Sequence, residues 1–186
     1  MKRVLLTGLG CLSLIVVVMV IAFTFAPTSF DYTNEVRIER PVEQTWAVFT
    51  DGSRMGEWIH GIERVENVSG EHLEVGSQWK LVMVEGGRDI EMVETVTACE
   101  PPSVFSFDMD NPWFLGQHAI TLRPEDGGAA TVLTAKNTVA GKGAFKRFLL
   151  WIGREGITAQ GQHAYEHLKE IVEAEPQPEA TGTQPT

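Results

Sequence analysis

Cysteine is scarce in this chain of 186 residues. The two that occur are Cys11, in an apolar run near the N-terminus, and Cys99, so no disulfide can form within the rest of the chain. A domain without disulfides depends on the packing of its core for stability. A catalytic cysteine needs a base beside it, and we interpret Cys99 instead as a small buried apolar residue.

Basic residues are also few. Lysine and arginine number 15 against 25 acidic residues, which gives a formal net charge of −10. Lys2 and Arg3 precede the apolar run, so the residues after it carry 13 bases and 25 acids, a charge of −12. Nucleic-acid binding depends on the neutralisation of phosphates by basic side chains. The charge therefore excludes nucleic acid as an expected partner.

The short motifs that mark common catalytic sites are missing. The chain has no phosphate-binding glycine-rich loop at a strand–helix junction, no zinc-protease motif and no serine nucleophile elbow. His163 and His167 have a spacing that suits two metal ligands, but no acidic residue or cysteine is placed with them. We therefore expect neither a metal nor a cofactor.

Charge is absent from residues 4–26, which are mostly leucine, valine and isoleucine. About 20 apolar residues span a bilayer, and this run is longer than the apolar region of a usual signal peptide. Positive flanks such as Lys2 and Arg3 stay in the cytoplasm. We predict a single-pass membrane protein with a cytoplasmic stub (residues 1–3), an uncleaved transmembrane anchor (residues 4–26) and an extracytoplasmic domain. A cleaved signal is the alternative.

One domain is expected at residues 34–174, after a linker at residues 27–33. Residues 175–186 contain three prolines and little that is apolar, which predicts a disordered tail. Residues 34–40 alternate apolar and charged side chains, as a half-buried strand does. Further strand-like runs, separated by turn signals, occupy residues 62–68, 77–84, 88–98, 103–109, 117–123 and 129–139.

Helices are expected at residues 42–49, at residues 53–58 as a short turn, and at residues 144–174 with a bend near Gly153. On a helical wheel the last of these starts with an apolar face that includes Phe145 and Ile152. Strands joined in succession by short turns form an antiparallel meander, and a sheet and a helix bury their apolar sides against each other. The predicted fold class is α+β, with a curved antiparallel sheet of about seven strands wrapped on the long C-terminal helix.

Several short motifs occur in a characteristic order. Residues 36–51 read V-R-I-E-R-P-V-E-Q-T-W-A-V-F-T-D, residues 75–79 read V-G-S-Q-W, and residues 96–102 read V-T-A-C-E-P-P. With Met55 and Trp58 between the first two, they resemble the START-like (SRPBCC) superfamily, which includes birch-pollen-allergen-like proteins and the polyketide cyclase/dehydrase and lipid-transport family. Thr45 replaces a valine of that pattern.

The resemblance covers residues 34–173 and implies a helix-grip fold with a cavity between the sheet and the helix. It does not imply one function, because the family includes cyclases, lipid carriers, hormone receptors and stress proteins. The anchor at residues 4–26 is an addition to the usual family pattern.

Aromatic and methionine side chains are spread along the predicted sheet and its loops, as in large apolar pockets that bind small molecules. They would also fill an ordinary core, and the resemblance favours a cavity. His118 shares the parity of Ile120 on its strand, which places it on the concave face, where it either orients a ligand or bonds internally. The expected ligand-binding residues are Trp58, Trp79, Met83, Met92, Phe105, Phe107, Trp113 and His118.

Four bases cluster around Trp151 at residues 142–154. Bases with an exposed aromatic side chain are typical of a membrane-surface contact, for which we name Lys146, Arg147 and Trp151. A solvated helix face is the alternative.

We predict a membrane-anchored domain that binds a hydrophobic small molecule or lipid between its sheet and its C-terminal helix, rather than an enzyme. A cyclase/dehydrase-type enzyme is one alternative, with His118, Glu94 or Arg88 as a polar group in the cavity. The other is an interaction module with a closed cavity and Trp151 in its docking surface. The sequence identifies neither the ligand nor a protein partner.

Overall fold

Seven antiparallel strands form one sheet, in the order β1-β7-β6-β5-β4-β3-β2. The computed structural model describes residues 23–176. From β2 onward each strand pairs with its successor in sequence, and β1 closes the far edge by pairing with β7. The strands are β1 (Ser29–Ile38), β2 (Ile62–Ser69), β3 (Gln78–Glu85), β4 (Arg88–Glu100), β5 (Val104–Asp110), β6 (Phe114–Glu125) and β7 (Ala130–Gly141).

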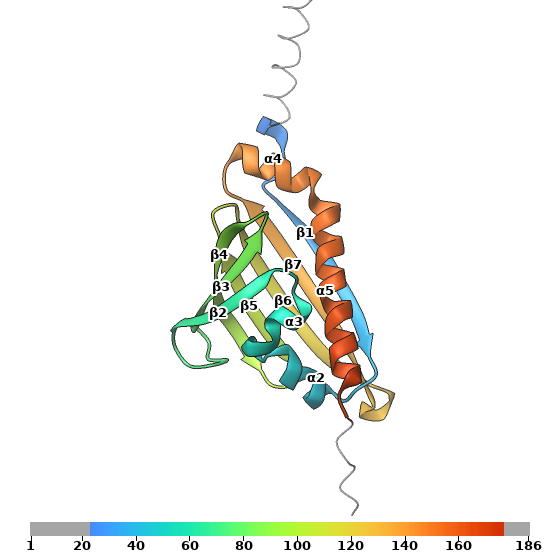
Figure 1. Cartoon of the computed structure of the whole chain (residues 1–186). Helices are drawn as coiled ribbons and strands as arrows, with labels where there is room; N and C mark the ends of the chain where they lie inside the picture. Colours follow the sequence, from blue (N-terminus) through green and yellow to red (C-terminus); the bar gives the residue numbers. More distant parts are fainter. Residues whose placement is uncertain (1–22, 177–186) are drawn as a thin grey trace, which may run out of the picture.

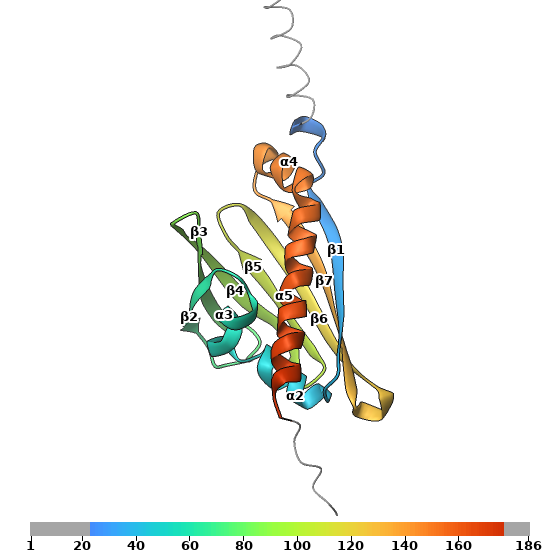
Figure 2. The same cartoon turned by 45° about the vertical axis from the view of Figure 1, so that its right-hand side comes forward.

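Helices cover one face of this sheet (Figure 1). α5 lies across the sheet, with α4 at its N-terminal end and α2 near its C-terminal end, and α3 lies close to β2 (Figure 2). The predicted α+β helix-grip architecture is therefore confirmed. The helical elements are α2 (Val42–Phe49), η1 (Gly52–Arg54), α3 (Met55–Trp58), η2 (Asp126–Gly128), α4 (Ala144–Ile152) and α5 (Arg154–Ala174).

β1 starts earlier than the sequence predicts. It begins at Ser29, which pairs with Ala140, so that most of the expected linker belongs to the sheet. The cause is that Phe30 and Tyr32 extend the alternation of the strand, and both are half-buried while Asp31 between them is exposed.

The C-terminal helical stretch breaks at Gly153, as expected, and its buried face differs from the prediction. Phe145 and Ile152, at the start of the face predicted to be apolar, are both 55% exposed. Leu168, on the part of the helix to which that face was predicted to drift, is fully buried, as is Val172. The reason is that α4 turns away from the axis of α5 at the break (Figure 1). One continuous helical wheel therefore does not describe the two helices.

The core lies at the end of the sheet near α2. Ile38 of β1, Ile120 of β6 and Leu133 of β7 are fully buried there with Leu168 of α5. The rings of Trp46, Phe49 and Phe105 pack edge to face beside them, with centroids 5.8–6.5 Å apart. This packing holds the C-terminal half of α5, and the N-terminal half covers a less filled part of the sheet.

The predicted membrane topology needs correction. Within residues 23–176, no helix is long and apolar enough to cross a membrane. Phe23, which the prediction places in the anchor, packs its ring against Phe145 and Phe148 of α4 instead, at centroid distances of 5.8 and 4.9 Å. The single-pass localisation is therefore contradicted. Residues 4–22 of the predicted anchor, and residues 177–186 of the predicted tail, lie outside the described residues.

Two glycines of α5 differ in what surrounds them. A Cβ added to Gly161 would lie 2.8 Å from Oδ1 of Asn34, a buried side chain whose amide donates to the Thr158 carbonyl oxygen at 3.0 Å. A Cβ at Gly156 would meet nothing within 4 Å. Gly161 therefore allows α5 to approach β1 closely, and Gly156 does not serve this purpose.

Alanine at these two positions is expected to have opposite effects. Gly161→Ala should lower the free energy of unfolding by about 1 kcal/mol, because the overlap with Asn34 outweighs the gain in helix propensity. Gly156→Ala should raise it by up to about 1 kcal/mol. Urea denaturation of both variants checks the pair, and equal shifts in the same direction would contradict the close approach at Gly161.

Candidate ligand-binding cavity

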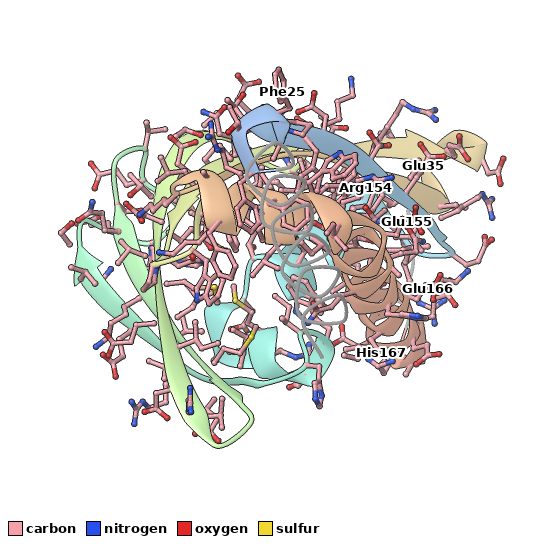
Figure 3. All side chains as sticks on the ribbon, turned by 90° about the horizontal axis from the view of Figure 1, so that it is seen from above. Phe25, Glu35, Arg154, Glu155, Glu166 and His167 are labelled. Atoms are coloured by element: carbon pink, nitrogen blue, oxygen red, sulfur yellow. The ribbon has the colours of Figure 1, made fainter. Side chains whose placement is uncertain are left out.

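A cavity of about 770 Å³ lies between the concave face of the sheet and the helices. All seven strands contribute side chains to its wall, together with α2, α3, α4 and α5. The size falls within the range of small-molecule sites, about 300–1,000 Å³. Seen along the long axis of the molecule, side chains fill much of the space between the sheet and the helices (Figure 3).

Strand register sets the wall residues in rows across the sheet. In one row, Trp79 of β3 pairs with Glu94 of β4, which pairs with Met109 of β5. In the neighbouring row, Phe107 of β5 pairs with His118 of β6. Successive residues of a strand point to opposite faces, so every second residue of these strands reaches the cavity.

The structure places all eight predicted ligand-binding residues on the cavity wall. Six of them stand on β3, β4, β5 and β6, and period-two alternation already predicted a shared face for Phe105 and Phe107 and the concave face for His118. Trp58 comes from α3 and Trp113 from the loop before β6. Their contact with a ligand stays a prediction, because the structure shows only the wall that they form.

Trp113 stands at the rim of the cavity, with 44% of its surface exposed. The loop that carries it is held by Asn111, whose Oδ1 accepts hydrogen bonds from the backbone N–H groups of Trp113 (2.7 Å) and Phe114 (3.0 Å). Lys142 N–H donates to the carbonyl oxygen of Trp113 at 2.8 Å. These bonds hold the backbone of the loop that carries the indole at the rim.

Glu94 is the most unusual residue of the wall. It is 6% exposed, and the described part of the chain offers its carboxyl group no hydrogen-bond partner. Burial raises the pKa of Glu94 to about 7. The sequence named Glu94 only as a candidate for the enzyme alternative, because a single glutamate within a strand does not by itself indicate whether its carboxyl group has a partner.

His118 makes one hydrogen bond and leaves one nitrogen free for another. Its Nδ1 lies 2.7 Å from Oδ1 of Asn137, and its ring stacks on Phe107 with centroids 4.7 Å apart. Asn137 uses its amide nitrogen toward the Ala135 carbonyl oxygen, so Oδ1 accepts and Nδ1 of the histidine carries the proton.

Desolvation lowers the pKa of His118, which keeps the imidazole neutral at neutral pH. Its Nε2 is then an acceptor, and it is buried without a partner among residues 23–176. The indole N–H of Trp58 is a donor in the same situation. Two polar atoms of opposite hydrogen-bonding character are thus left without a partner in the described domain.

Sequence reasoning missed the contribution of the helix and of the first residues of β1. Tyr165 of α5 stacks on Trp58 with centroids 6.2 Å apart, and Tyr32 of β1 also lines the cavity. Burial raises the pKa of both phenols, so they are neutral donors. The helical spacing of the α5 wall residues would have found Tyr165; these residues are Ile157, Gln160, Gly161, Ala164 and Tyr165.

Lysine and arginine are absent from the described wall, in which Asp51 and Glu94 carry the carboxyl groups. Arg88, which the enzyme alternative names, is exposed at the β3–β4 turn and does not reach the cavity. Cys99 packs against the core, and desolvation raises the pKa of its thiol, which opposes the nucleophilic thiolate form.

The basic cluster around Trp151 is largely engaged within the domain. Lys142 pairs with Asp110, and the ammonium of Lys146 lies 5.7 Å from the ring centroid of Trp113. Arg154 stacks over the Trp151 ring at 4.9 Å. Trp151 is 38% exposed and Arg147 is half-buried. The membrane-surface contact predicted for Lys146, Arg147 and Trp151 stays a prediction.

A curved antiparallel sheet that holds an apolar cavity under a long C-terminal helix defines the helix-grip class of ligand-binding domains. The sequence model of one family of this class, described as "Polyketide cyclase / dehydrase and lipid transport", matches residues 29–173. The chain belongs to this family.

Solved structures share the fold at low sequence identity. Ara h 8.0201 superposes with a TM-score of 0.63 at 14% identity, covering 79% of this chain and 99% of its own. TTHA0849 from Thermus thermophilus gives 0.63 at 17%, covering 77% and 97%. The Zhui aromatase/cyclase from Streptomyces sp. R1128 gives 0.59 at 12%, covering 77% and 96%. At such identities the likeness shows the fold alone. Among curated proteins, no sequence matches this chain.

Proposed function

We propose that this protein binds a hydrophobic small molecule or lipid in the cavity between its sheet and α5. The observation that carries the proposal is the cavity of about 770 Å³ with a wall of aromatic, methionine and aliphatic side chains. Burial of apolar ligand surface there contributes about 25 cal/mol per Å². The chain belongs to a family whose description names polyketide cyclases, dehydrases and lipid transport, and this membership supports a ligand-binding role.

The eight residues predicted from the sequence supply the contact surface in this proposal. Trp58 and Phe107 present ring faces or edges to the ligand, and Met83 and Met92 adapt to its shape. Trp113 at the rim covers the ligand from the solvent side. The imidazole of His118, stacked on Phe107, adds to this surface.

Filling the cavity from the helix side tests the proposal. Ala164 lines the cavity from α5, so Ala164→Phe places a ring inside it. The variant should bind the neutral apolar dye Nile red at least tenfold more weakly than the delipidated wild-type chain, measured by fluorescence titration. The control is Ala174→Phe, at an exposed position of the same helix, which should bind like the wild type.

Binding that is unaffected by Ala164→Phe would place the dye elsewhere and contradict the proposal. A wild-type chain that takes up no Nile red after delipidation would also contradict it. Thermal unfolding of both variants shows whether the fold is intact, and the two midpoints should agree within a few degrees.

A cyclase/dehydrase-type reaction is the second candidate, favoured by the two titratable groups Glu94 and His118 on the cavity wall. His118→Ala distinguishes the two functions. A binding protein retains its Nile red affinity within about threefold, whereas an enzyme loses turnover of any substrate that the wild type converts. The interaction-module alternative requires a closed cavity, and the cavity of about 770 Å³ favours ligand binding over it.

A further inference from the structure

The side chain of Glu94 is 6% exposed, and its carboxyl group has no hydrogen-bond partner within the described domain. A polar group taken out of water without a hydrogen bond costs free energy, and most such groups in folded proteins are paired. The side chain faces the cavity from the middle of the sheet, between Trp79 on β3 and Met109 on β5. A group on the ligand is therefore the partner that the geometry leaves for it.

The other charged and titratable groups of the wall do not supply a counter-charge. Tyr165 faces Glu94 from α5, close enough to interact with it electrostatically, and Tyr32 lies on β1. His118 on β6 is neutral at neutral pH, and His72 lies in the β2–β3 loop near the rim. Asp51 already accepts hydrogen bonds from the N–H and hydroxyl of Ser53, at 2.9 and 2.6 Å.

The charge of the wall discriminates between ligand classes. Among the described residues that form it there are two acidic side chains and no lysine or arginine, so a carboxylate or phosphate ligand would meet no permanent positive charge. A cation is attracted both by a carboxylate and by the faces of aromatic rings, of which Trp58, Trp79 and Tyr165 are examples here.

We propose that the cavity takes an apolar ligand with a protonated amine, and that the ammonium group binds the carboxylate of Glu94. This inference rests on the proposed function, because it names the class of ligand for the same cavity. The apolar body of the ligand lies against the aromatic and methionine wall, and the amine reaches the row of residues that contains Glu94.

The proposal implies a pH dependence. Burial raises the pKa of Glu94 to about 7, so in the empty cavity the carboxyl group is protonated at pH 5.5 and ionised at pH 8. An alkylamine remains charged throughout this range, since such amines have pKa values of about 10. The preference for an amine should therefore strengthen as the pH rises.

Three ligands with the same chain and different polar ends test the proposal. Decylamine, 1-decanol and decanoate are titrated, below their micelle concentrations, against Nile red bound to the delipidated full chain. At pH 8 decylamine should bind at least tenfold more tightly than 1-decanol, and decanoate more weakly than either. At pH 5.5 the difference between amine and alcohol should shrink to about threefold or less.

Glu94→Gln should abolish the preference for the amine and leave the affinity for 1-decanol unchanged, which also shows that the cavity is intact. The matched control is Glu91→Gln on the same strand, at an exposed position on the opposite face, which should keep the preference.

Equal affinities of wild type for decylamine and 1-decanol at pH 8 would overturn the inference, as would an amine preference that survives Glu94→Gln. Both results leave the proposed function standing, because a ligand still binds. If none of the three compounds binds and Nile red is not taken up, the proposed function fails, and the inference fails with it.

Discussion

Leu168→Ala is expected to lower the free energy of unfolding by about 4 kcal/mol. Leu168 is fully buried on α5, in the cluster that also contains Ile38, Trp46 and Ile120. Truncating a buried leucine removes its transfer free energy and leaves a void that the neighbours fill only in part, with losses of about 2–5 kcal/mol. Because domains are stable by only about 5–15 kcal/mol, this single change removes a large share of the total.

Urea denaturation measures the loss as a lower midpoint with an unchanged slope. His167→Ala is the matched control, since this neighbouring side chain is exposed on the outer side of α5 (Figure 3). It should change the free energy of unfolding by no more than about 0.5 kcal/mol. Similar losses in both variants would show that α5 is not held by the core at its C-terminal half.

Glu94 should make the protein less stable as the pH rises. Burial raises the pKa of Glu94 in the folded state to about 7, from an ordinary value of 4.5. Between these pH values the folded state binds a proton that the unfolded state has already released, so the free energy of unfolding falls with increasing pH. The contribution is fully present below pH 4.5 and is lost as the pH passes 7, a difference of about 3 kcal/mol.

Glu94→Gln isolates this contribution from the other titrating groups. At pH 4 the variant and wild type should be about equally stable, and at pH 8 the variant should be more stable by about 3 kcal/mol. Urea denaturation at intervals of one pH unit gives both curves, with Glu91→Gln as the exposed control. Parallel curves for wild type and Glu94→Gln would mean that the carboxyl group has an ordinary pKa in the folded state.

Stability and ligand binding are linked through the same residue. An unpaired carboxylate opposes folding at pH 8, and an ammonium group beside it removes part of that cost. Under the proposal made above, an amine should therefore stabilise the wild type more at pH 8 than at pH 5.5. A destabilising group in a binding site is a common consequence of selection for function.

Much of the cavity wall was predictable because it stands on strands. Phe105 and Phe107 alternate on β5, and His118 shares the parity of Ile120 on β6, so period-two alternation was sufficient to put them on one face. The prediction worked without knowledge of the partner strands, since the face of a residue depends only on its position within its own strand.

Other parts of the site were not predictable in this way. Glu94 shares a face with Met92 and Val96, but alternation alone does not say that its carboxyl group lacks a partner. Tyr165 was missed because the helical wheel was drawn through Gly153, where the helix axis changes direction. Hydropathy alone predicted an anchor at residues 4–26, whereas the ring of Phe23 packs against α4.

The sequence by itself determined the order of the elements, the antiparallel sheet and the concave face of each strand. Alternation, turn residues and helix breakers act between near neighbours in the chain. They can therefore be recognised in the sequence without knowledge of the fold. Only the tertiary structure decided that a cavity of about 770 Å³ separates α5 from the sheet and that Glu94 is left unpaired within it. Both depend on the distance between the layers, which is set by contacts such as those of Leu168 and Gly161 between residues far apart in the chain.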